Sequence, residues 1–248
     1  MHATTSTALA TLAFALGAAA DDYAFGKTFY LGPTSGDAYI TKATYSVAAP
    51  PVPCNYGDST ASNPIWMSFW IGFAEDVSDS SKPFVQPYFN WAPDQESQGC
   101  PASNDAWCVT ASTYFESGQK GQDYVAVPKN ANLDFEVTSD GKGTIEQTVT
   151  MNGKVVSQQS DDVGFNPTWF FGSNECYSDD CGTLNSYEWT DVVINLSAAD
   201  KAFADTLSAD GVIIEGLSSS DGKVWKADSI KVSKDHFPAS ESSSETCS

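Results

Sequence analysis

The sequence predicts an all-β fold, a single antiparallel sandwich or barrel with one short helix. Short runs rich in β-branched and aromatic residues recur along the chain, with turn residues between them. Asn152-Gly153 is a strong hairpin turn, and residues 139–143 join a second pair of runs. Setting aside the first 20 of 248 residues leaves 228, which suits one β domain of the larger size.

The expected strands follow one another with short connections. In chain order they are 38–47, 65–73, 84–91, 107–115, 122–127, 132–138, 143–151, 154–159, 187–195, 212–216 and 223–232. Residues 28–31 also have the composition of a strand. The one expected helix covers residues 197–207, because Ser197 and Asp200 have the spacing of a capping box.

The N-terminus has the features of a secretory signal peptide over residues 1–20. Residues 7–16 are small or apolar, and three alanines, residues 18–20, supply a small-residue cleavage site. No later stretch reaches the ~18 apolar residues that a membrane span needs. We therefore expect a secreted protein with a β-sandwich domain over residues 21–238 and a Ser-rich tail over 239–248. The sequon at Asn195 fits glycosylation in that compartment.

Six cysteines favour an oxidising compartment and three disulfides. The shortest separation favours a local pair of Cys176 with Cys181. Cys100 with Cys108 would close a second small loop, which leaves Cys54 for Cys247. Zinc is disfavoured, because paired Cys-x-x-Cys or histidine ligands are missing.

Charge and histidine content exclude several classes of function. The chain has 32 acidic residues against 12 lysines and no arginine, so nucleic acid is disfavoured as a partner. Such a balance suits either an acidic medium, where carboxylates are protonated, or simple solubility. After the signal only His236 remains, which makes a histidine-dependent serine or cysteine hydrolase improbable. We expect no cofactor, no metal, no membrane association and a monomer.

One strand carries polar side chains among aromatic neighbours. Side chains alternate between the two faces of a strand, so Gln86, Tyr88 and Asn90 are expected to share one face. Trp66 and Trp70 would likewise share a face of the preceding strand. Glu188 has a similar setting about a hundred residues later. An amide and a carboxylate on facing strands could polarise a carbonyl and activate a water.

Three motifs resemble, in order and spacing, those of the glutamic peptidases (eqolisins). They are Trp70-Ile71-Gly72-Phe73, Phe84-Val85-Gln86 and Tyr187-Glu188-Trp189. The resemblance spans residues 43–196 and implies a concanavalin-like antiparallel β-sandwich (jelly roll). It also implies a secreted, fungal-type acid endopeptidase acting on polypeptides.

The resemblance implies a role for each matching residue. Glu188 would be the general base that activates water, Gln86 would stabilise the oxyanion, and Trp70 would shape the cleft. The chain departs from the family pattern at Pro87-Tyr88, where the peptidases have Thr-Gly. After Trp107 it also lacks the acidic residue found in those enzymes.

The alternative interpretation is a non-catalytic or glycan-binding protein on the same fold. Its sugar contacts would come from aromatic and amide side chains on one sheet, namely Trp66, Trp70, Tyr88, Asn90, Trp107 and Tyr114. Glycan cleavage would need two carboxylates flanking the bond, and the strand signature that supplies them is missing. This branch therefore favours binding over hydrolysis.

Overall fold

The computed structural model describes residues 23–79, 81–129, 131–238 and 247. These residues form two large antiparallel sheets packed face to face, with a small third sheet at one end. The predicted concanavalin-like β-sandwich is confirmed. The predicted signal peptide and nearly all of the Ser-rich tail lie outside the described residues. Among the described residues, none forms a helix long and apolar enough to cross a membrane.

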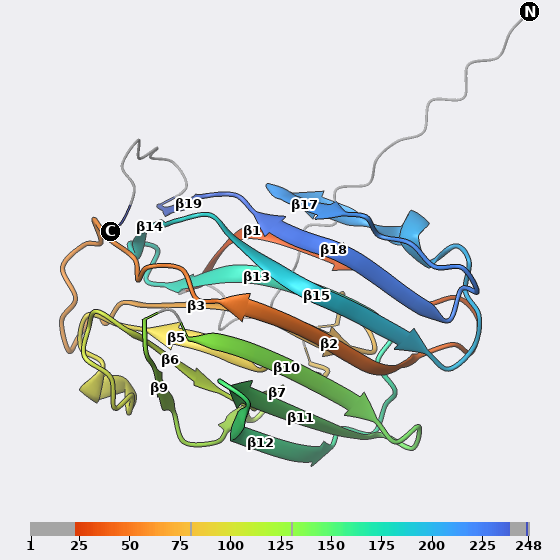
Figure 1. Cartoon of the computed structure of the whole chain (residues 1–248). Coiled ribbons are helices and arrows are strands. Elements are labelled where there is room, and N and C mark those ends of the chain that lie inside the picture. The colour runs from red at the N-terminus through yellow and green to blue at the C-terminus, as the bar shows by residue number, and fades with distance from the viewer. Residues whose placement is uncertain (1–22, 80, 130, 239–246, 248) are drawn as a thin grey trace, which may run out of the picture.

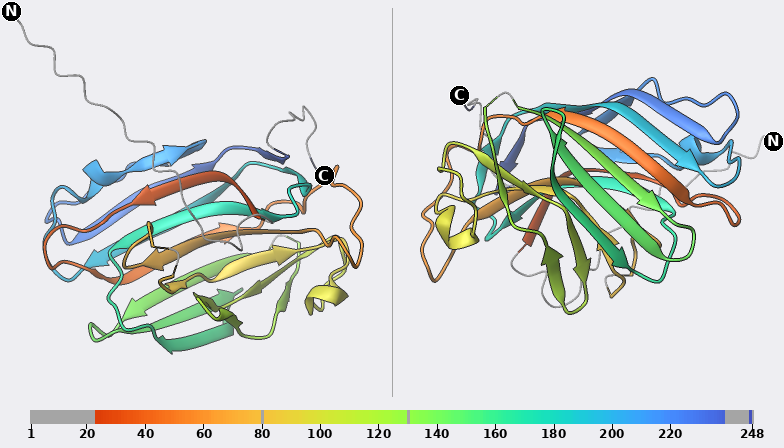
Figure 2. Two further views of the ribbon diagram at one scale, coloured as in Figure 1. Left: turned by 180° about the vertical axis from the view of Figure 1, so that it is seen from behind. Right: turned by 60° about the horizontal axis from the view of Figure 1, so that its bottom comes forward.

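One sheet has ten strands and lies behind the other in Figure 1. Its strands are β1 (Tyr23–Leu31), β3 (Trp66–Ala74), β4 (Phe84–Val85), β5 (Tyr88–Trp91), β6 (Trp107–Thr110), β7 (Ser112–Phe115), β8 (Gly118–Gly121), β9 (Val125–Val127), β13 (Trp169–Tyr177) and β16 (Ser208–Asp210). Its main path runs β16-β1-β13-β3-β4-β7-β8, and β5 pairs with β3 and β6. The left view of Figure 2 shows this sheet from its outer side.

The other sheet has seven strands in the order β12-β11-β10-β2-β15-β18-β17. These are β2 (Ile40–Ala48), β10 (Asn132–Ser139), β11 (Thr144–Met151), β12 (Lys154–Asp162), β15 (Tyr187–Leu196), β17 (Val212–Glu215) and β18 (Val224–Val232). The third sheet pairs β14 (Gly182–Leu184) with β19 (Asp235–Phe237). His236 lies in β19, with Nδ1 2.9 Å from Thr183 Oγ1.

The core fills the space between the two large sheets with aromatic rings. Phe69, Phe89, Phe135 and Trp189 are each at most 2% exposed, and Tyr45 packs among them. Such rings bury a large apolar area and prefer offset or edge-to-face contacts. They fix which side chains of each strand face inward, and therefore which face outward.

All three predicted disulfides are confirmed: Cys54–Cys247, Cys100–Cys108 and Cys176–Cys181. The predicted helix over residues 197–207 is reduced to one 3-10 turn, Phe203–Thr206. Its only companion among the described residues is a 3-10 turn at Glu96–Gln98. Asp200 points its carboxylate at the backbone N–H of Ser35 and Ala202, so it fastens a loop and caps no α-helix.

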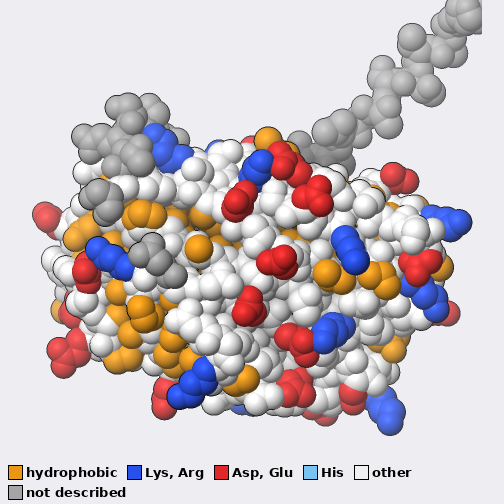
Figure 3. Space-filling view, in the orientation of Figure 1, with side chains coloured by type: hydrophobic (Ala, Val, Ile, Leu, Met, Phe, Trp, Pro, Cys, Tyr) orange, Lys and Arg blue, Asp and Glu red, His pale blue; other side chains and the backbone are white. Residues whose placement is uncertain are grey.

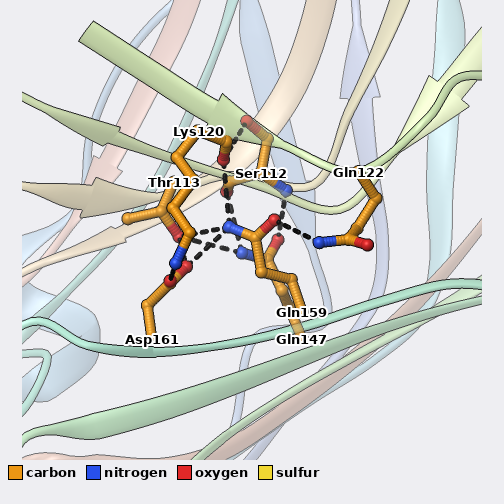
Figure 4. A network of polar contacts seen from close by, with 7 residues as sticks. All are labelled: Ser112, Thr113, Lys120, Gln122, Gln147, Gln159 and Asp161. Carbon is orange, nitrogen blue, oxygen red and sulfur yellow. Dashed lines mark hydrogen bonds and ion pairs between the residues drawn. The ribbon is translucent and has the colours of Figure 1, made fainter.

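A polar network lies between the sheets near the edge formed by β7 and β8 (Figure 4). Asp161 of β12 has a side chain only 2% exposed, and it accepts hydrogen bonds from Thr113, Gln159 and Lys120. Burial raises the pKa of Asp161, but these three hydrogen bonds outweigh it, so the pKa lies below its ordinary value. The network therefore holds an ionised carboxylate and ties β8 to the opposite sheet.

Candidate active site

The outer face of the ten-stranded sheet brings a carboxyl and an amide to the two sides of a serine. Ser68 of β3 lies opposite Glu175 of β13 and, on its other side, opposite Asn90 of β5. Because strands lie ~4.8 Å apart, the Cα atoms of Glu175 and Asn90 are ~10 Å apart across β3. Only the short Ser68 side chain stands between them on this face.

Two tryptophans flank Ser68 along β3. Trp66 and Trp70 lie two residues on either side of Ser68 and therefore face the same way. Trp66 stacks on Tyr177 with ring centroids 3.8 Å apart, and Tyr23 meets both rings edge-on. We call this group of side chains the Ser68 niche: Ser68 is at its centre, with Glu175, Asn90, Trp66 and Trp70 around it.

Glu175 is the perturbed acid of this face. The residue is half-buried, its carboxyl is enclosed, and the indole Nε1–H of Trp70 donates to Oε2 at 2.9 Å. Burial raises the pKa of the Glu175 carboxyl to about 7, and the hydrogen bond from Trp70 opposes that rise. A carboxyl that exchanges its proton near neutral pH, within a site of other polar groups, is a candidate for acid–base chemistry.

Asn90 brings a hydrogen-bond donor that has no acceptor among the described residues. Its Oδ1 accepts from Ser68 Oγ at 3.1 Å, while its buried Nδ2 has no acceptor. Leaving a buried donor unpaired costs ~1–3 kcal/mol, so such a group calls for an explanation. An oxygen entering the niche would supply the missing acceptor.

Aromatic residues continue outside the niche. Trp70 is 4% exposed and packs with Phe171, Phe84 and Tyr88 in an apolar cluster on the outer face, separate from the core. The Tyr88 hydroxyl lies 2.6 Å from that of Tyr124. Burial, the neighbouring tyrosine and the charge of Glu175 raise the pKa of Tyr88, so its hydroxyl keeps its proton over the whole ordinary pH range.

The predicted pairing of Gln86 with Glu188 is wrong, because the two side chains do not face one another. Gln86 does share the outer face of the ten-stranded sheet with Tyr88 and Asn90, as the alternation predicted. Glu188, however, lies on β15 of the other sheet, beside Lys231, and is exposed. Because Trp189 fills the core, its neighbour Glu188 must point away from the ten-stranded sheet.

Two further predicted residues lie elsewhere. Trp107 is 2% exposed and packs between the sheets on Phe69 and Phe89, with Nε1–H donating to Pro50 O, so it cannot line an outer surface. Asn195 is half-buried on β15, at the opposite face of the molecule from the niche. Its glycosylation stays a prediction.

The outer face of the seven-stranded sheet offers a different kind of surface. A hollow of about 340 Å³ lies over β2, β10, β11 and β15, lined by Thr44, Tyr45, Ser46, Asp134, Phe135, Glu136, Thr150 and Asp191. Figure 3 shows carboxylates spread over the middle of this face. Among the described residues, no group of three or more His, Cys, Asp or Glu could hold a metal ion.

No protein-family model matches this sequence, and no curated protein matches it either. Solved structures do match. A scytalido-glutamic peptidase with a transition state analog inhibitor is 12% identical, with a TM-score of 0.52 over 86% of this chain and 97% of that chain. The chain has the fold of the glutamic peptidases.

Two more solved structures match with lower TM-scores. SCP-B, an eqolisin in a complex with the tripeptide Ala-Ile-His, is 12% identical with a TM-score of 0.46, over 87% of this chain and 98% of that chain. A Bacillus licheniformis β-glucanase is 8% identical with a TM-score of 0.32, over 86% and 83%. At such identities the likeness to glutamic peptidases concerns the fold alone, and the chemistry must be argued from the niche.

Proposed function

We propose that the chain is a secreted endopeptidase in which Glu175, and not Glu188, is the catalytic carboxyl. The observation that carries the proposal is the raised pKa of Glu175 beside an unused amide donor. The three disulfides are consistent with an oxidising, extracellular compartment. The substrate would be an extended polypeptide lying along the outer face of the ten-stranded sheet.

The proposed reaction needs one carboxylate and one amide. Ionised Glu175 accepts a proton from water while the water oxygen attacks the carbonyl carbon of a peptide bond. Asn90 Nδ2 donates to the oxyanion that forms, a contribution typically worth ~3 kcal/mol. The protonated Glu175 then gives its proton to the nitrogen of the leaving amine as the C–N bond breaks. Trp70 holds the carboxyl in place throughout.

This mechanism changes the expected pH dependence. A base with a pKa of about 7 is protonated in acid, so the acid optimum that the resemblance to the glutamic peptidases implied does not follow from the niche. Cleavage of an unfolded protein substrate should rise with pH along a single titration centred near 7. The measurement is a rate profile from pH 3 to 9 with pepstatin present to suppress aspartic proteases. A maximum at pH 3–4 that declines toward neutrality would contradict the role of Glu175.

Glycan binding is a second candidate, favoured by the half-exposed Trp66 and Tyr177 beside the niche. Aromatic side chains of this kind can contact sugar rings, and Asn90 and Ser68 could hydrogen-bond hydroxyl groups. On this account, Trp66→Ala abolishes binding to a β-glucan oligosaccharide array, whereas Glu175→Gln leaves it unchanged. Loss of binding in Glu175→Gln would instead tie the sugar to the carboxyl.

A further inference from the structure

The carboxamide of Gln86 lies outside the niche and has an unsatisfied atom. Gln86 is 6% exposed, and its buried Oε1 has no hydrogen-bond partner. Its Nε2 donates to Gln119 Oε1 at 3.3 Å, a long bond, and its backbone N–H donates to Ser112 O at 2.8 Å. The side chain is thus directed toward β8, away from Glu175, since β3 and β4 lie between β13 and β7.

Gln119 makes the contacts that a peptide group would make. Its carboxamide accepts a hydrogen bond from Gln86 and donates one to Ser112 Oγ. A carboxamide offers one carbonyl acceptor and N–H donors, which is the chemistry of a backbone amide. Gln119 is itself exposed, so this carboxamide lies over Gln86 from the solvent side.

The strand that brings Gln119 to this position lies at the edge of the ten-stranded sheet. β8 ends the ten-stranded sheet, pairs only with β7, and is exposed along its whole length. It begins at Gly118, whose φ of 120° suits glycine alone. Lys120 ties it to Asp161 through a side chain that is 60% exposed (Figure 4). Edge strands of this kind open locally at low free-energy cost.

The separation between Gln86 and Asn90 matches the length of a short extended peptide. Gln86 and Asn90 face the same way and are four residues apart, which is ~13 Å along an extended strand. An extended substrate covers the same distance in four residues. A chain that places a peptide bond at Asn90 would therefore reach Gln86 about four residues away, after passing Tyr88.

We propose that Gln86 and Ser112 form a subsite for a backbone amide of a polypeptide, about four residues from the hydrolysed bond, and that Gln119 occupies this subsite until the polypeptide displaces it. The inference rests on the proposed function for the place of the hydrolysed bond. Gln119 is then an internal competitor of the substrate. Displacing it lets the backbone amide take over its bonds to Gln86 and Ser112 and approach the unpaired Oε1.

The test compares two acetylated Ala-Ser peptides of four and eight residues by calorimetric titration. The full mature chain carries Glu175→Gln, so that neither peptide is consumed. Adding Gln119→Ala should lower the Kd of the eight-residue peptide about three- to ten-fold, the value of one hydrogen bond. The Kd of the four-residue peptide should not change, because that peptide is too short to reach Gln86 from the niche.

Two further variants control the result. Gln158→Ala removes an exposed glutamine on β12 that contacts neither Gln86 nor β8, and it should leave both Kd values unchanged. Gln86→Met should remove the gain that Gln119→Ala gives. The subsite would be overturned if Gln119→Ala left the Kd of the eight-residue peptide unchanged or raised it. It would also be overturned if neither peptide bound.

Failure of the subsite can be separated from failure of the proposed function. The titrations measure binding in a variant without the catalytic carboxyl, so they do not depend on turnover. A wild-type chain that hydrolyses nothing, but shows the Gln119→Ala effect, would retain the subsite and lose the peptidase. Hydrolysis that depends on Glu175, without any effect of Gln119→Ala, would do the reverse.

Discussion

At the scale of single residues, the proposed chemistry depends on Glu175 and on the indole of Trp70 that donates to it. The sequence reasoning chose Glu188, because Tyr187-Glu188-Trp189 carried the family motif. A motif match does not reveal which side of a strand faces solvent. The direction of Glu188 is set by its neighbour Trp189, which is buried in the core. Glu188 therefore points to the opposite side of the strand, beside Lys231. By contrast, the shared face of Gln86, Tyr88 and Asn90 followed from alternation alone, because period two is a local property.

The raised pKa of Glu175 predicts how stability depends on pH. The ordinary value of 4.5 applies to the unfolded chain, so between about pH 4.5 and 7 the folded state holds a proton that the unfolded state has lost. The free energy of unfolding should therefore fall as pH rises through this window, by at most about 3 kcal/mol from this group. Urea denaturation at pH 5 and pH 7.5 measures the fall.

Glu175→Gln is the control, because glutamine keeps the shape and cannot titrate. The variant should show a smaller difference between the two pH values than the wild type. Equal differences in the two proteins would mean that Glu175 titrates alike in the folded and unfolded chain. In that case the physical basis for its catalytic role would be gone.

At the scale of elements, the decisive omission from the sequence reasoning was β13. The middle of this strand, residues 172–175, contains glycine, serine and asparagine, which have low strand propensity. The sequence therefore carried no strand signal there. Those small and polar residues are accommodated by tertiary packing: a Cβ at Gly172 would lie 2.7 Å from the Phe29 ring, and Asn174 donates to buried Asp235. Because β13 was missed, so was Glu175.

Long strands with clear alternation were predicted well, including β2, β3, β10, β11 and β15. Their partners were not, since register depends on contacts between distant residues. The 197–207 segment is a second example. It has the spacing of a capping box, but the Asp200 carboxylate accepts a hydrogen bond from the backbone N–H of Ser35, 165 residues away. Local sequence cannot foresee such a partner.

The interior network at β8 gives a prediction at this scale. Lys120→Met leaves Asp161 buried without its cation and should destabilise the fold by about 1–3 kcal/mol at pH 7. The lowered pKa of Asp161 stabilises the fold above about pH 4 and loses that effect as pH falls, so the cost should shrink in acid. Denaturant unfolding of wild type and variant at pH 7 and pH 3 tests both statements.

A matched lysine shows what a surface ion pair contributes. Lys82 pairs with Glu75, and both side chains are more than 40% exposed. Lys82→Met should therefore cost much less than Lys120→Met at either pH. If Lys82→Met proved as costly as Lys120→Met, burial of Asp161 would not be the source of the effect.

At the scale of the whole molecule, the chain is closed by the disulfide from Cys54 to Cys247, a separation of 193 residues. Cys247 also exchanges two backbone hydrogen bonds with the Asn185 side chain. In the loop-entropy model such a bridge stabilises by ~5 kcal/mol, against ~2 kcal/mol for the short Cys176–Cys181 loop. The double Cys→Ala variant of the long bridge should thus lower the unfolding free energy more than that of the short one. The reverse order would show that local packing outweighs loop closure.

In the whole molecule, the ten-stranded sheet carries the core on one side and the Ser68 niche on the other. We propose that Glu175, and not Glu188, is the functional carboxyl. The direct measurement is cleavage of an unfolded protein at neutral pH, with pepstatin, by the wild type, Glu175→Gln and Glu188→Gln. The account predicts cleavage by the wild type and by Glu188→Gln, and at least a hundred-fold loss in Glu175→Gln. Activity retained in Glu175→Gln, or lost in Glu188→Gln, would contradict it.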